Sequence, residues 1–368
     1  MKRGFRIAAF LFACLLGLSL CGCAPRADAS PASDLQRFSR RQLDIFDTEI
    51  TLTGFAADQA AFDRTADETM ALLREYHQLF DDYNAYDDLH NLYYVNLHAA
   101  QEPVEVSPVF FDLLTWCREK WLAGFRQTNV AMGSVLKIWH EYRSAGLNDP
   151  QNAQLPPAAA LEEAARHTDF DKMILDADRR TVYFSDPLMQ LDLGAVAKGY
   201  AADLVLPLLK KEMPSFLLSL GGNVYAGDAP LDGRENWNVG VQDPRADGLQ
   251  AAAGGTDILD VLEIHGLTAV TSGDYWRYYV VDSQRYHHII DPETLFPARK
   301  MISVSVVCES SLLADYLSTS LFILSYEDGM QLLEKLDGVE CMWVDAEGQI
   351  RCTPGMSRYL RSLKNQRQ

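Results

Sequence analysis

The segment LDLGAVAKGYAAD, residues 191–203, places an aspartate and a lysine on either side of a turn. Asp192 ends a short apolar run, Gly194 and small alanines follow, and Lys198 lies in the first turn of an expected helix. The helix dipole disfavours a lysine at that position unless an anion is present. The segment therefore indicates either an ordinary strand-to-helix connection with a solvated lysine or a backbone that approaches an anionic ligand.

A second pair of residues has the chemistry of a metal site. Asp315 and Thr319 are four residues apart in LADYLSTSLF, a segment of helical composition, so their side chains share one face of the helix. A carboxylate and a hydroxyl at this spacing supply two oxygen ligands for Mg²⁺, which keeps several waters and also takes substrate phosphates. Taken alone, a solvated aspartate and a threonine bonded to its own helix backbone explain the pair better.

Two further segments offer backbone and hydroxyl donors beside strands. SLGGNVYAGD has the glycine pair 221–222 at a strand end. AVTSGDY has the hydroxyls of Thr271 and Ser272 and the backbone amide of Gly273 as hydrogen-bond donors. His287 and His288 precede an IIDP turn. Side chains alternate between faces along a strand, so only one of the two histidines can face a given site.

These residues need a scaffold, and the pattern predicts helices early and strands late in the chain. Pro108 follows Ser107, a good N-cap, and Pro207 predicts a kink or break near Leu206. The grouping favours an α+β fold with a mostly antiparallel sheet. The expected helices are 58–80, 107–124, 199–211, 311–324 and 327–337; strand composition marks 45–55, 216–222, 237–244, 260–273, 276–291 and 302–310, and a hairpin at 340–353 turns at Glu347–Gly348.

The first residues predict export. Basic residues within the first six positions precede an apolar run that ends at Leu20 and is too short for a normal transmembrane helix. A membrane anchor is the alternative, but the polar stretch that follows gives no stop-transfer pattern. LCGC resembles a bacterial lipobox, which implies cleavage after residue 22 and a diacylated Cys23; Cys21 fits less well because the large Leu20 precedes it.

The sequence thus predicts a lipoprotein signal peptide at 1–22, a lipidated N-terminus and flexible linker at 23–40, and one domain at 41–368. Lipid alone would hold this domain on the extracytoplasmic face of the cell membrane. The formal net charge of the whole chain is −18, and removal of the basic signal peptide makes it more negative. A nucleic-acid partner is excluded because phosphate binding needs a basic surface.

Four cysteines follow the lipobox, and none has metal-ligand spacing. Burial as small apolar side chains is favoured for Cys117 and Cys308. The sequence does not decide whether Cys341 and Cys352 form a disulfide across the C-terminal hairpin.

The ordered motifs DLGAVAKGYAAD, SLGGNVYAGD, WNVGVQDP, TSGDYWRYYV, HHIIDP and ADYLSTSLF together resemble the FAD:protein FMN transferases, also called ApbE or flavin-trafficking lipoproteins. The resemblance extends from FDTEITL to the C-terminal hairpin. It implies a single large domain of two interlocked α/β subdomains related to the T-fold. It also implies that FAD binds as substrate in a cleft that holds Mg²⁺.

The resemblance assigns roles to individual residues. Mg²⁺ would be held by the Ala195 carbonyl with Asp315 and Thr319, and the proposed catalytic residues are His288 as base, Asp315 and Lys198. Lys198 would lie near the FAD pyrophosphate, and His288 beside the phosphates. The implied FAD contacts are Phe46, Tyr83, Gln127, Thr128, Asn129, Asp192, Lys198, His288, Ile289 and Ile290.

Three residues depart from the family pattern. Asn129 stands where an aspartate is common, Ser134 replaces a proline, and Leu295 replaces the glycine of the HIIDPxTGxP motif. These differences leave the metal ligands intact and put the shape of the flavin pocket and the balance of transfer and hydrolysis in question.

The expected reaction is Mg²⁺-dependent transfer of FMN from FAD to a threonine hydroxyl of a target flavoprotein, with release of AMP. The acceptors implied are membrane flavoproteins of ion-pumping or extracellular electron-transfer complexes that carry a Ser/Thr-rich motif. Two alternatives are an FAD pyrophosphatase, which uses the same site with water, and a non-catalytic flavin-binding or solute-binding lipoprotein. The metal-ligand pair argues against the second.

Overall fold

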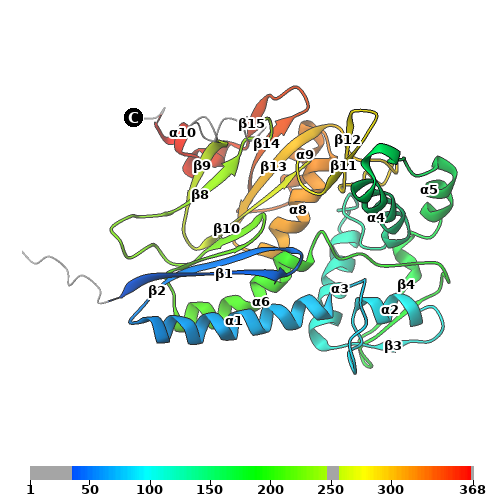
Figure 1. The fold of residues 1–368 in the computed structure, drawn as a ribbon, viewed down its shortest axis with the longest axis horizontal. Helices are drawn as coiled ribbons and strands as arrows, with labels where there is room; N and C mark the ends of the chain where they lie inside the picture. The colour runs from blue at the N-terminus through cyan, green and yellow to red at the C-terminus, as the bar shows by residue number, and fades with distance from the viewer. Residues whose placement is uncertain (1–34, 247–256, 366–368) are drawn as a thin grey trace, which may run out of the picture. The chain divides into compact units, whose positions relative to one another are not determined.

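The computed structural model describes residues 35–246 and 257–365 (Figure 1). The predicted signal peptide, Cys23 and most of the predicted linker lie outside these residues. Strand β1 begins at Gln36, within the segment 23–40 that the sequence predicted as a linker. No helix among the described residues is both long and apolar enough to cross a bilayer.

An eight-stranded sheet forms the centre of the domain, and every adjacent pair of its strands is antiparallel. The first hairpin of the chain joins the later strands in this one sheet, which confirms the mostly antiparallel α+β architecture. In spatial order the strands are β1 (Gln36–Ile45), β2 (Thr48–Ala56), β6 (Phe216–Leu220), β7 (Asn223–Ala226), β10 (Leu267–Gly273), β13 (Met301–Cys308), β14 (Glu340–Asp345) and β15 (Ile350–Cys352).

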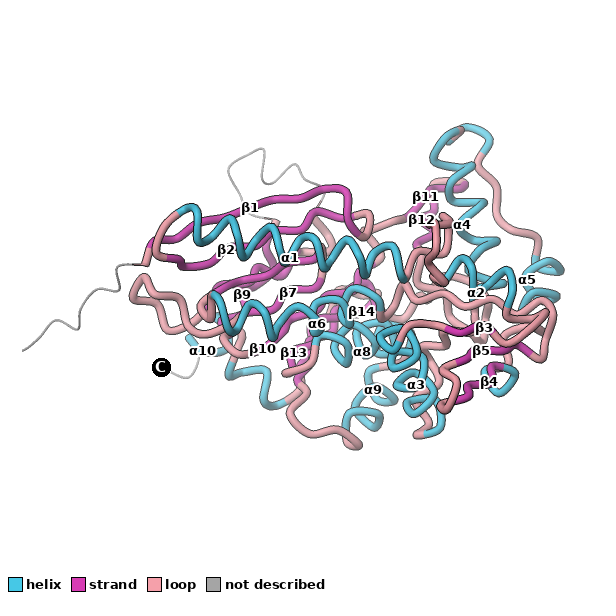
Figure 2. Tube along the Cα trace, turned by 90° about the horizontal axis from the view of Figure 1, so that it is seen from below, coloured by secondary structure: helices cyan, strands magenta, loops and turns pink. Residues whose placement is uncertain are grey.

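Helices α1 (Gln59–Leu79), α6 (Ala197–Glu212) and α8 (Ser311–Ile323) cover one face of the sheet (Figure 2). Asp58 caps α1, and Ser310 caps α8, each with its side-chain oxygen. Apolar residues of α1 and α6, including Phe62 and Leu209, are fully buried against β2 and β6. Each such side chain contributes about 1.5–3 kcal/mol by burial. The short helix α9 (Tyr326–Leu333) follows α8.

The other face is covered by a two-stranded ribbon, β8 (Trp237–Gln242) and β9 (Ile258–Ile264), with a 3₁₀ turn at Pro354–Arg358 and helix α10 (Arg361–Asn365). Trp237 is 1% exposed and packs with apolar residues of the sheet in a separate cluster. The central strands of the sheet, such as β13, are therefore buried on both faces.

The remaining elements pack at one end of the sheet. They include a three-stranded sheet in the order β3-β5-β4 and a second hairpin, β11 with β12. A continuous hydrophobic cluster joins α3 to α8 and β13, so the two parts share a core and form one domain. The elements are α2 (Leu92–His98), β3 (Val104–Glu105), α3 (Pro108–Leu122, capped by Ser107), α4 (Gly133–Asn148), 3₁₀ turns at Pro150–Asn152 and Phe170–Lys172, α5 (Ala158–Ala165), β4 (Met173–Asp176), β5 (Thr181–Phe184), β11 (Tyr278–Val281) and β12 (Gln284–His287).

Several sequence predictions need correction. The strand expected at 45–55 starts only at Thr48, because the chain turns at Phe46 and Asp47, whose φ values are 54° and 49°. A kink or break was expected near Leu206; the break is absent, since α6 continues through Pro207 to Glu212. Burial of Leu206 and its apolar neighbours in the core outweighs the one hydrogen bond that proline removes. The strand segments 260–273 and 276–291 each divide at a tight turn into two strands.

The strand register decides the question of the C-terminal disulfide. Cys352 of β15 pairs with Met342 of β14, so these two side chains lie on one face of the sheet, and Cys341 points to the other. Cys341 packs in the cluster beneath α8, whereas Cys352 packs against the cluster under β8 and β9. Both thiols are free, and the register excludes a bridge between them.

Candidate active site

A cavity of about 550 Å³ lies where the sheet meets α4, α6 and α8. Its wall includes the β1–β2 turn, the turn before α6, and the first residues of β7. The structure brings every site residue predicted from the sequence to this one cavity; their contacts with FAD or a metal stay predictions. The residues are Phe46, Tyr83, Gln127, Thr128, Asn129, Asp192, Ala195, Lys198, His288, Ile289, Ile290, Asp315 and Thr319.

The centre of the site is a contact between two helices. The N-cap residue of α6, Val196, has no side chain that can accept a hydrogen bond. Asp315 of α8 takes that role, because the Gly199 N–H donates to its Oδ2 at 2.9 Å. The start of α6 therefore holds a carboxylate from another helix, and the carboxylate is 4% exposed.

Gly199 makes this contact geometrically feasible. A Cβ at position 199 would lie 2.3 Å from the Ser311 carbonyl oxygen and 2.7 Å from Asp315 Cβ. Real atoms do not approach this closely, so any larger residue would push α6 away from α8. The glycine in AKGYAAD thus sets the distance between the two helices that carry the predicted site.

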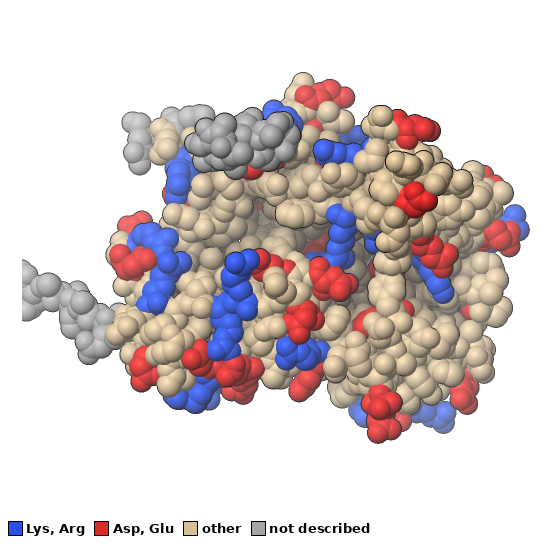
Figure 3. Space-filling view, viewed as in Figure 1, with Lys and Arg blue, Asp and Glu red and all other residues tan. Residues whose placement is uncertain are grey.

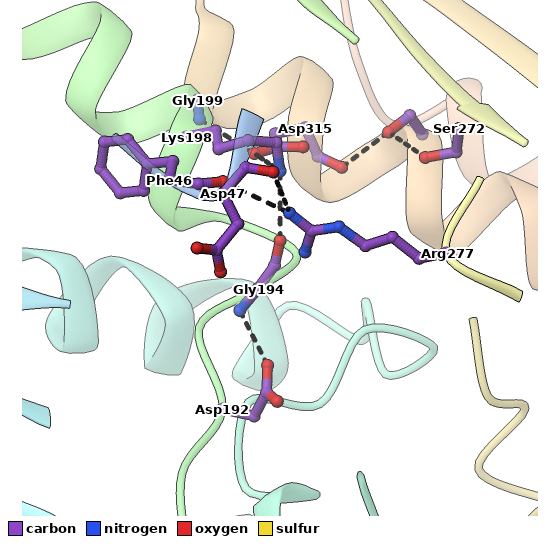
Figure 4. Close-up of polar contacts among 10 residues, drawn as sticks. Phe46, Asp47, Asp192, Gly194, Lys198, Gly199, Ser272, Arg277 and Asp315 are labelled. Atoms are coloured by element: carbon purple, nitrogen blue, oxygen red, sulfur yellow. Dashed lines mark hydrogen bonds and ion pairs between the residues drawn. The ribbon is translucent and has the colours of Figure 1, made fainter. Parts of the chain in front are cut away.

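Lys198 lies beside the same carboxylate (Figure 4). Its Nζ is 3.8 Å from Asp315 Oδ2 and 3.4 Å from the Gly194 carbonyl oxygen. Lys198 in the first turn of a helix needs a nearby anion to offset the helix dipole. Asp315 supplies this anion before any ligand binds. Burial raises the pKa of Asp315, while the Lys198 charge and the Gly199 N–H act in the opposite direction.

The residues present fit a divalent cation with a preference for oxygen ligands. The Asp315 carboxylate, the Gly194 carbonyl and the Thr319 side chain lie in one cavity wall, and a cation, the Lys198 ammonium, already lies near the first two. Oxygen-only donor sets suit Mg²⁺. The carbonyl nearest Lys198 is that of Gly194; Ala195 also lines the cavity, and its carbonyl as a ligand stays a prediction.

The two histidines divide as the strand argument expects. His287 is 3% exposed, and its ring bonds to the Ala298 carbonyl at 2.8 Å and accepts from the Ile289 N–H, so it is structural. His288 lines the cavity, and its buried Nδ1 has no hydrogen-bond partner. Burial, helped by nearby positive charge, lowers the pKa of His288 well below its usual range. His288 was expected to act as the base because a free imidazole titrates near working pH; its burial instead favours the neutral ring in the ligand-free protein.

Residues 127–129 line the cavity, and most of their polar groups form hydrogen bonds within the protein. The Thr128 hydroxyl is 2.7 Å from Ser320 Oγ, and the Asn129 amide donates to the Thr168 carbonyl and accepts from the Ala131 N–H. Only Gln127 keeps a buried amide oxygen without a partner. Thr128 and Asn129 therefore hold the loop in place through these bonds.

Sequence reasoning missed a polar group of residues in the cavity. Tyr83 is 3.2 Å from His140 Nδ1, and Arg143 donates to the same nitrogen at 2.8 Å. Asp82 lies near Asp192; burial and the charge of that neighbour raise the pKa of Asp82 to about 7. Burial also raises the pKa of Asp192, whose Oδ1 accepts from the Gly194 N–H. Tyr83 and Asp192 were predicted; the missed residues are Asp82, His140 and Arg143, and only their position in the fold reveals them.

Two turns meet at the cavity. Arg277, with φ of 44°, donates to the Phe46 carbonyl at 3.3 Å, and Phe46 itself has φ of 54° (Figure 4). Left-handed conformations of bulky residues cost free energy and often occur at functional sites. Trp276 beside Arg277 is 51% exposed and also lines the cavity. On the face drawn in Figure 3, acidic and basic side chains are interspersed.

Comparison with known proteins matches this arrangement to one family. The family model described as ApbE matches residues 46–343. The chain belongs to the ApbE family. It is 35% identical over 286 residues to a Treponema pallidum protein named FAD:protein FMN transferase, with 73% of this chain and 74% of that protein covered. A Klebsiella pneumoniae protein of the same name is 33% identical over 252 residues, with 68% and 73% covered.

A solved structure of the ApbE protein from Thermotoga maritima matches with a TM-score of 0.75 and 26% identity. The match covers 89% of this chain and all of that one. It confirms the mixed α/β fold that the sequence predicted for an ApbE protein.

The structure explains how two departures from the ApbE pattern are accommodated. Leu295, where the family motif has glycine, adopts φ of 62°, a conformation that glycine takes without strain. Packing around the partly buried Leu295 and a bond from Trp139 Nε1 to its carbonyl hold it there. Ser134, at the second residue of α4, replaces a proline where proline is tolerated, and its hydroxyl bonds to the Ala164 carbonyl of α5.

Proposed function

We propose that this ApbE protein transfers FMN from FAD to a threonine hydroxyl of a target flavoprotein in a Mg²⁺-dependent reaction that releases AMP. The observation that carries the proposal is the buried Asp315 carboxylate at the N-terminus of α6, with Lys198 beside it in a cavity that Thr319 also lines. The names of the relatives at 35% and 33% identity support transfer of FMN from FAD to a protein.

The residues of the α6–α8 contact would bind the FAD pyrophosphate. A bound Mg²⁺ supplies charge neutralisation at phosphate oxygens and would be held by Asp315, Thr319 and a carbonyl of the turn before α6. Lys198 adds a second positive charge, and the start of α6 adds the partial positive charge of its N–H groups. Phosphoryl transfer depends mainly on such positioning and charge stabilisation.

In the transfer, the threonine oxygen forms a bond to the FMN-side phosphorus, and the bond from that phosphorus to the bridging oxygen breaks. The threonine proton needs an acceptor. His288 offers a neutral imidazole whose Nδ1 is buried in the cavity without a partner, which is the state that a general base requires. His288 is therefore the proposed base.

The contacts proposed for the rest of FAD lie along the same wall. Phe46, Tyr83, residues 127–129 and the pair Ile289–Ile290 provide aromatic, amide and apolar surface. A cavity of about 550 Å³ falls within the range of small-molecule and cofactor sites. Arg143 and Arg277 also line the cavity, and sequence reasoning included neither of them.

The alternative reaction at this site is hydrolysis of FAD to FMN and AMP. Purified protein with FAD and Mg²⁺ should consume FAD slowly alone and rapidly when an acceptor carrying a Ser/Thr-rich motif is added. Mass spectrometry should then find the acceptor heavier by one FMN phosphoryl group. Full-rate consumption without an acceptor, and no modified acceptor, would establish the hydrolase instead.

A non-catalytic flavin-binding lipoprotein is the other alternative. Flavin capture alone gives no reason to bury a carboxylate beside a lysine in the ligand cavity. If FAD binds tightly but neither FMN nor AMP is released under any metal condition, this alternative replaces the transferase.

We further propose that diacylated Cys23 tethers the domain to the extracytoplasmic face of the cell membrane, where membrane flavoproteins of ion-pumping or electron-transfer complexes would be its acceptors. Two acyl chains suffice for stable attachment. Cys23→Ser should move the protein out of the membrane fraction with unchanged FAD turnover. Retention in membranes would show that another segment anchors the chain.

A further inference from the structure

The cavity contains buried polar atoms that lack partners in the ligand-free protein. Most polar side chains of its wall are satisfied: Thr271 bonds to Ser305, and Ser272 bonds to Ser318. The unpartnered buried atoms in the wall belong to Gln127, His288 and Asn223 among the described residues. Asn223 differs from the other two because both its amide nitrogen and its amide oxygen lack a partner.

Asn223 is fixed in place by the sheet. It is the first residue of β7, it pairs with Leu220 of β6 and Val270 of β10, and it is 1% exposed. A Cβ on the preceding Gly222 would lie 2.7 Å from the Thr271 carbonyl oxygen, so glycine at 222 lets β7 approach β10 closely. The amide therefore cannot swing out to solvent.

The Asn223 amide lies beside Asp315. It is among the groups that oppose the effect of burial on the pKa of the Asp315 carboxyl, although the two side chains make no hydrogen bond of normal geometry. Asp315 Oδ2 already accepts from the Gly199 N–H. A buried amide with no partner destabilises the folded protein, and an apolar residue at the start of β7 would avoid that cost. Asn223 therefore has no structural role that its contacts explain.

We propose that Asn223 is a positioning residue for the metal-binding carboxylate. When the site is loaded, its amide nitrogen donates to Asp315, and its amide oxygen accepts a hydrogen bond from a water or ligand group at the cation. This inference rests on the proposed Mg²⁺-dependent function and extends it to a residue outside the three predicted ligands. Asn223 increases the affinity for the cation by orienting the Asp315 carboxylate.

Mn²⁺ binding to the FAD-free protein tests the proposal, with Asn223→Ala and Asn223→Val as variants. Val suits a strand and removes the unpartnered amide, so this variant should melt no lower than the wild type. Both variants should bind Mn²⁺ about tenfold more weakly, a change of about 1.4 kcal/mol, in a titration followed by electron paramagnetic resonance. The Mg²⁺ concentration for half-maximal FAD turnover should rise likewise, and high Mg²⁺ should restore the maximal rate.

Ser303→Ala is the matched control. Ser303 lies on β13, is 1% exposed and has a buried hydroxyl without a partner, but it does not line the cavity. This variant should bind Mn²⁺ as the wild type does. Wild-type affinity in both Asn223 variants, or an equal loss in Ser303→Ala, would overturn the inference. If the wild type itself turns over FAD without a divalent cation, the proposed function fails instead, so the two failures are distinguishable.

Discussion

The two ends of the cavity are built in different ways. At one end, Lys198, Gly199 and Asp315 contact one another across two packed helices, and the carboxylate is 4% exposed. At the other end, Tyr83 and His140 come from a loop and from α4, and Tyr83 is 51% exposed. We refer to these as the helix end and the loop end.

The difference concerns how much each end can adjust. At the helix end, the α6–α8 distance is fixed by Gly199, and a small shift would break the hydrogen bond to Asp315. At the loop end, the exposed Tyr83 and the half-buried Arg143 both bond to His140, so they can exchange these contacts for a ligand. Rigid helix ends suit the precise placement of a cation and phosphates, and loops suit recognition of a large ring system.

The largest expected effect is at the helix end. Asp315→Ala should reduce Mg²⁺-dependent FAD turnover by at least about a hundredfold, because it removes the charged oxygen ligand. FAD binding, measured by flavin fluorescence, should weaken only in part, since most of the cavity is unchanged. Asp315→Asn keeps an acceptor for the Gly199 N–H and should fold normally, yet be as inactive as the Ala variant. Normal turnover in either variant would remove Asp315 from the ligand set.

Gly199→Ala tests whether the helix contact is as rigid as the atom distances imply. The added Cβ would collide with backbone and with Asp315, so the free energy of unfolding in urea should fall by about 1–3 kcal/mol. Gly240→Ala is a matched control, because a Cβ there would meet only the flexible end of Ile258 at 3.0 Å. Equal stability losses in the two variants would show that the helix end tolerates expansion.

Lys198→Ala tests whether Lys198 interacts both with Asp315 in the ligand-free protein and with the phosphates of FAD. The helix dipole alone predicts that the ligand-free variant is at least as stable as the wild type. Because Lys198 also contacts Asp315, we instead expect the variant to lose about 1 kcal/mol of unfolding free energy. FAD binding should weaken about tenfold, with little change for riboflavin, which has no phosphate. Lys211→Ala, at the exposed end of the same helix, is the control for thermal melts and titrations. Equal losses for FAD and riboflavin would contradict a phosphate contact.

The last prediction concerns a pH dependence of stability at the loop end. Burial and Asp192 raise the pKa of Asp82 from 3.8 to about 7, so the folded state binds this proton more tightly than the unfolded state. This contribution to stability is complete below about pH 4 and is lost as the pH rises towards 7. The slope is at most about 1.4 kcal/mol per pH unit.

Urea unfolding between pH 4 and 8 checks this expectation. Asp82→Asn should show a flatter stability profile than the wild type over that range. The exposed Asp87, changed to Asn, should keep the wild-type profile. If Asp82→Asn and the wild type lose stability in parallel, the Asp82–Asp192 interaction does not govern the loop end.

The sequence by itself determined the parts of the site that lie close together along the chain. Asp192 to Gly199 is one short segment, Asp315 and Thr319 are one helical turn apart, and alternation along a strand separated His287 from His288. Local geometry is enough to relate such residues, because the helix and strand periods fix which side chains share a face. The same reasoning predicted α1, α3 and α8, and the Ser107 cap of α3.

Only the tertiary structure decided which distant residues meet. The Gly199–Asp315 bond joins residues 116 positions apart, and nothing in either segment specifies the other as its partner. His140 and Arg143 lie in a segment without a motif, and Asn223 became notable only when its amide proved buried without a partner. Pro207 likewise stayed inside α6 because core packing outweighed its local cost. Periodicity and caps act over a few residues, whereas helix packing, strand register and burial depend on the whole chain.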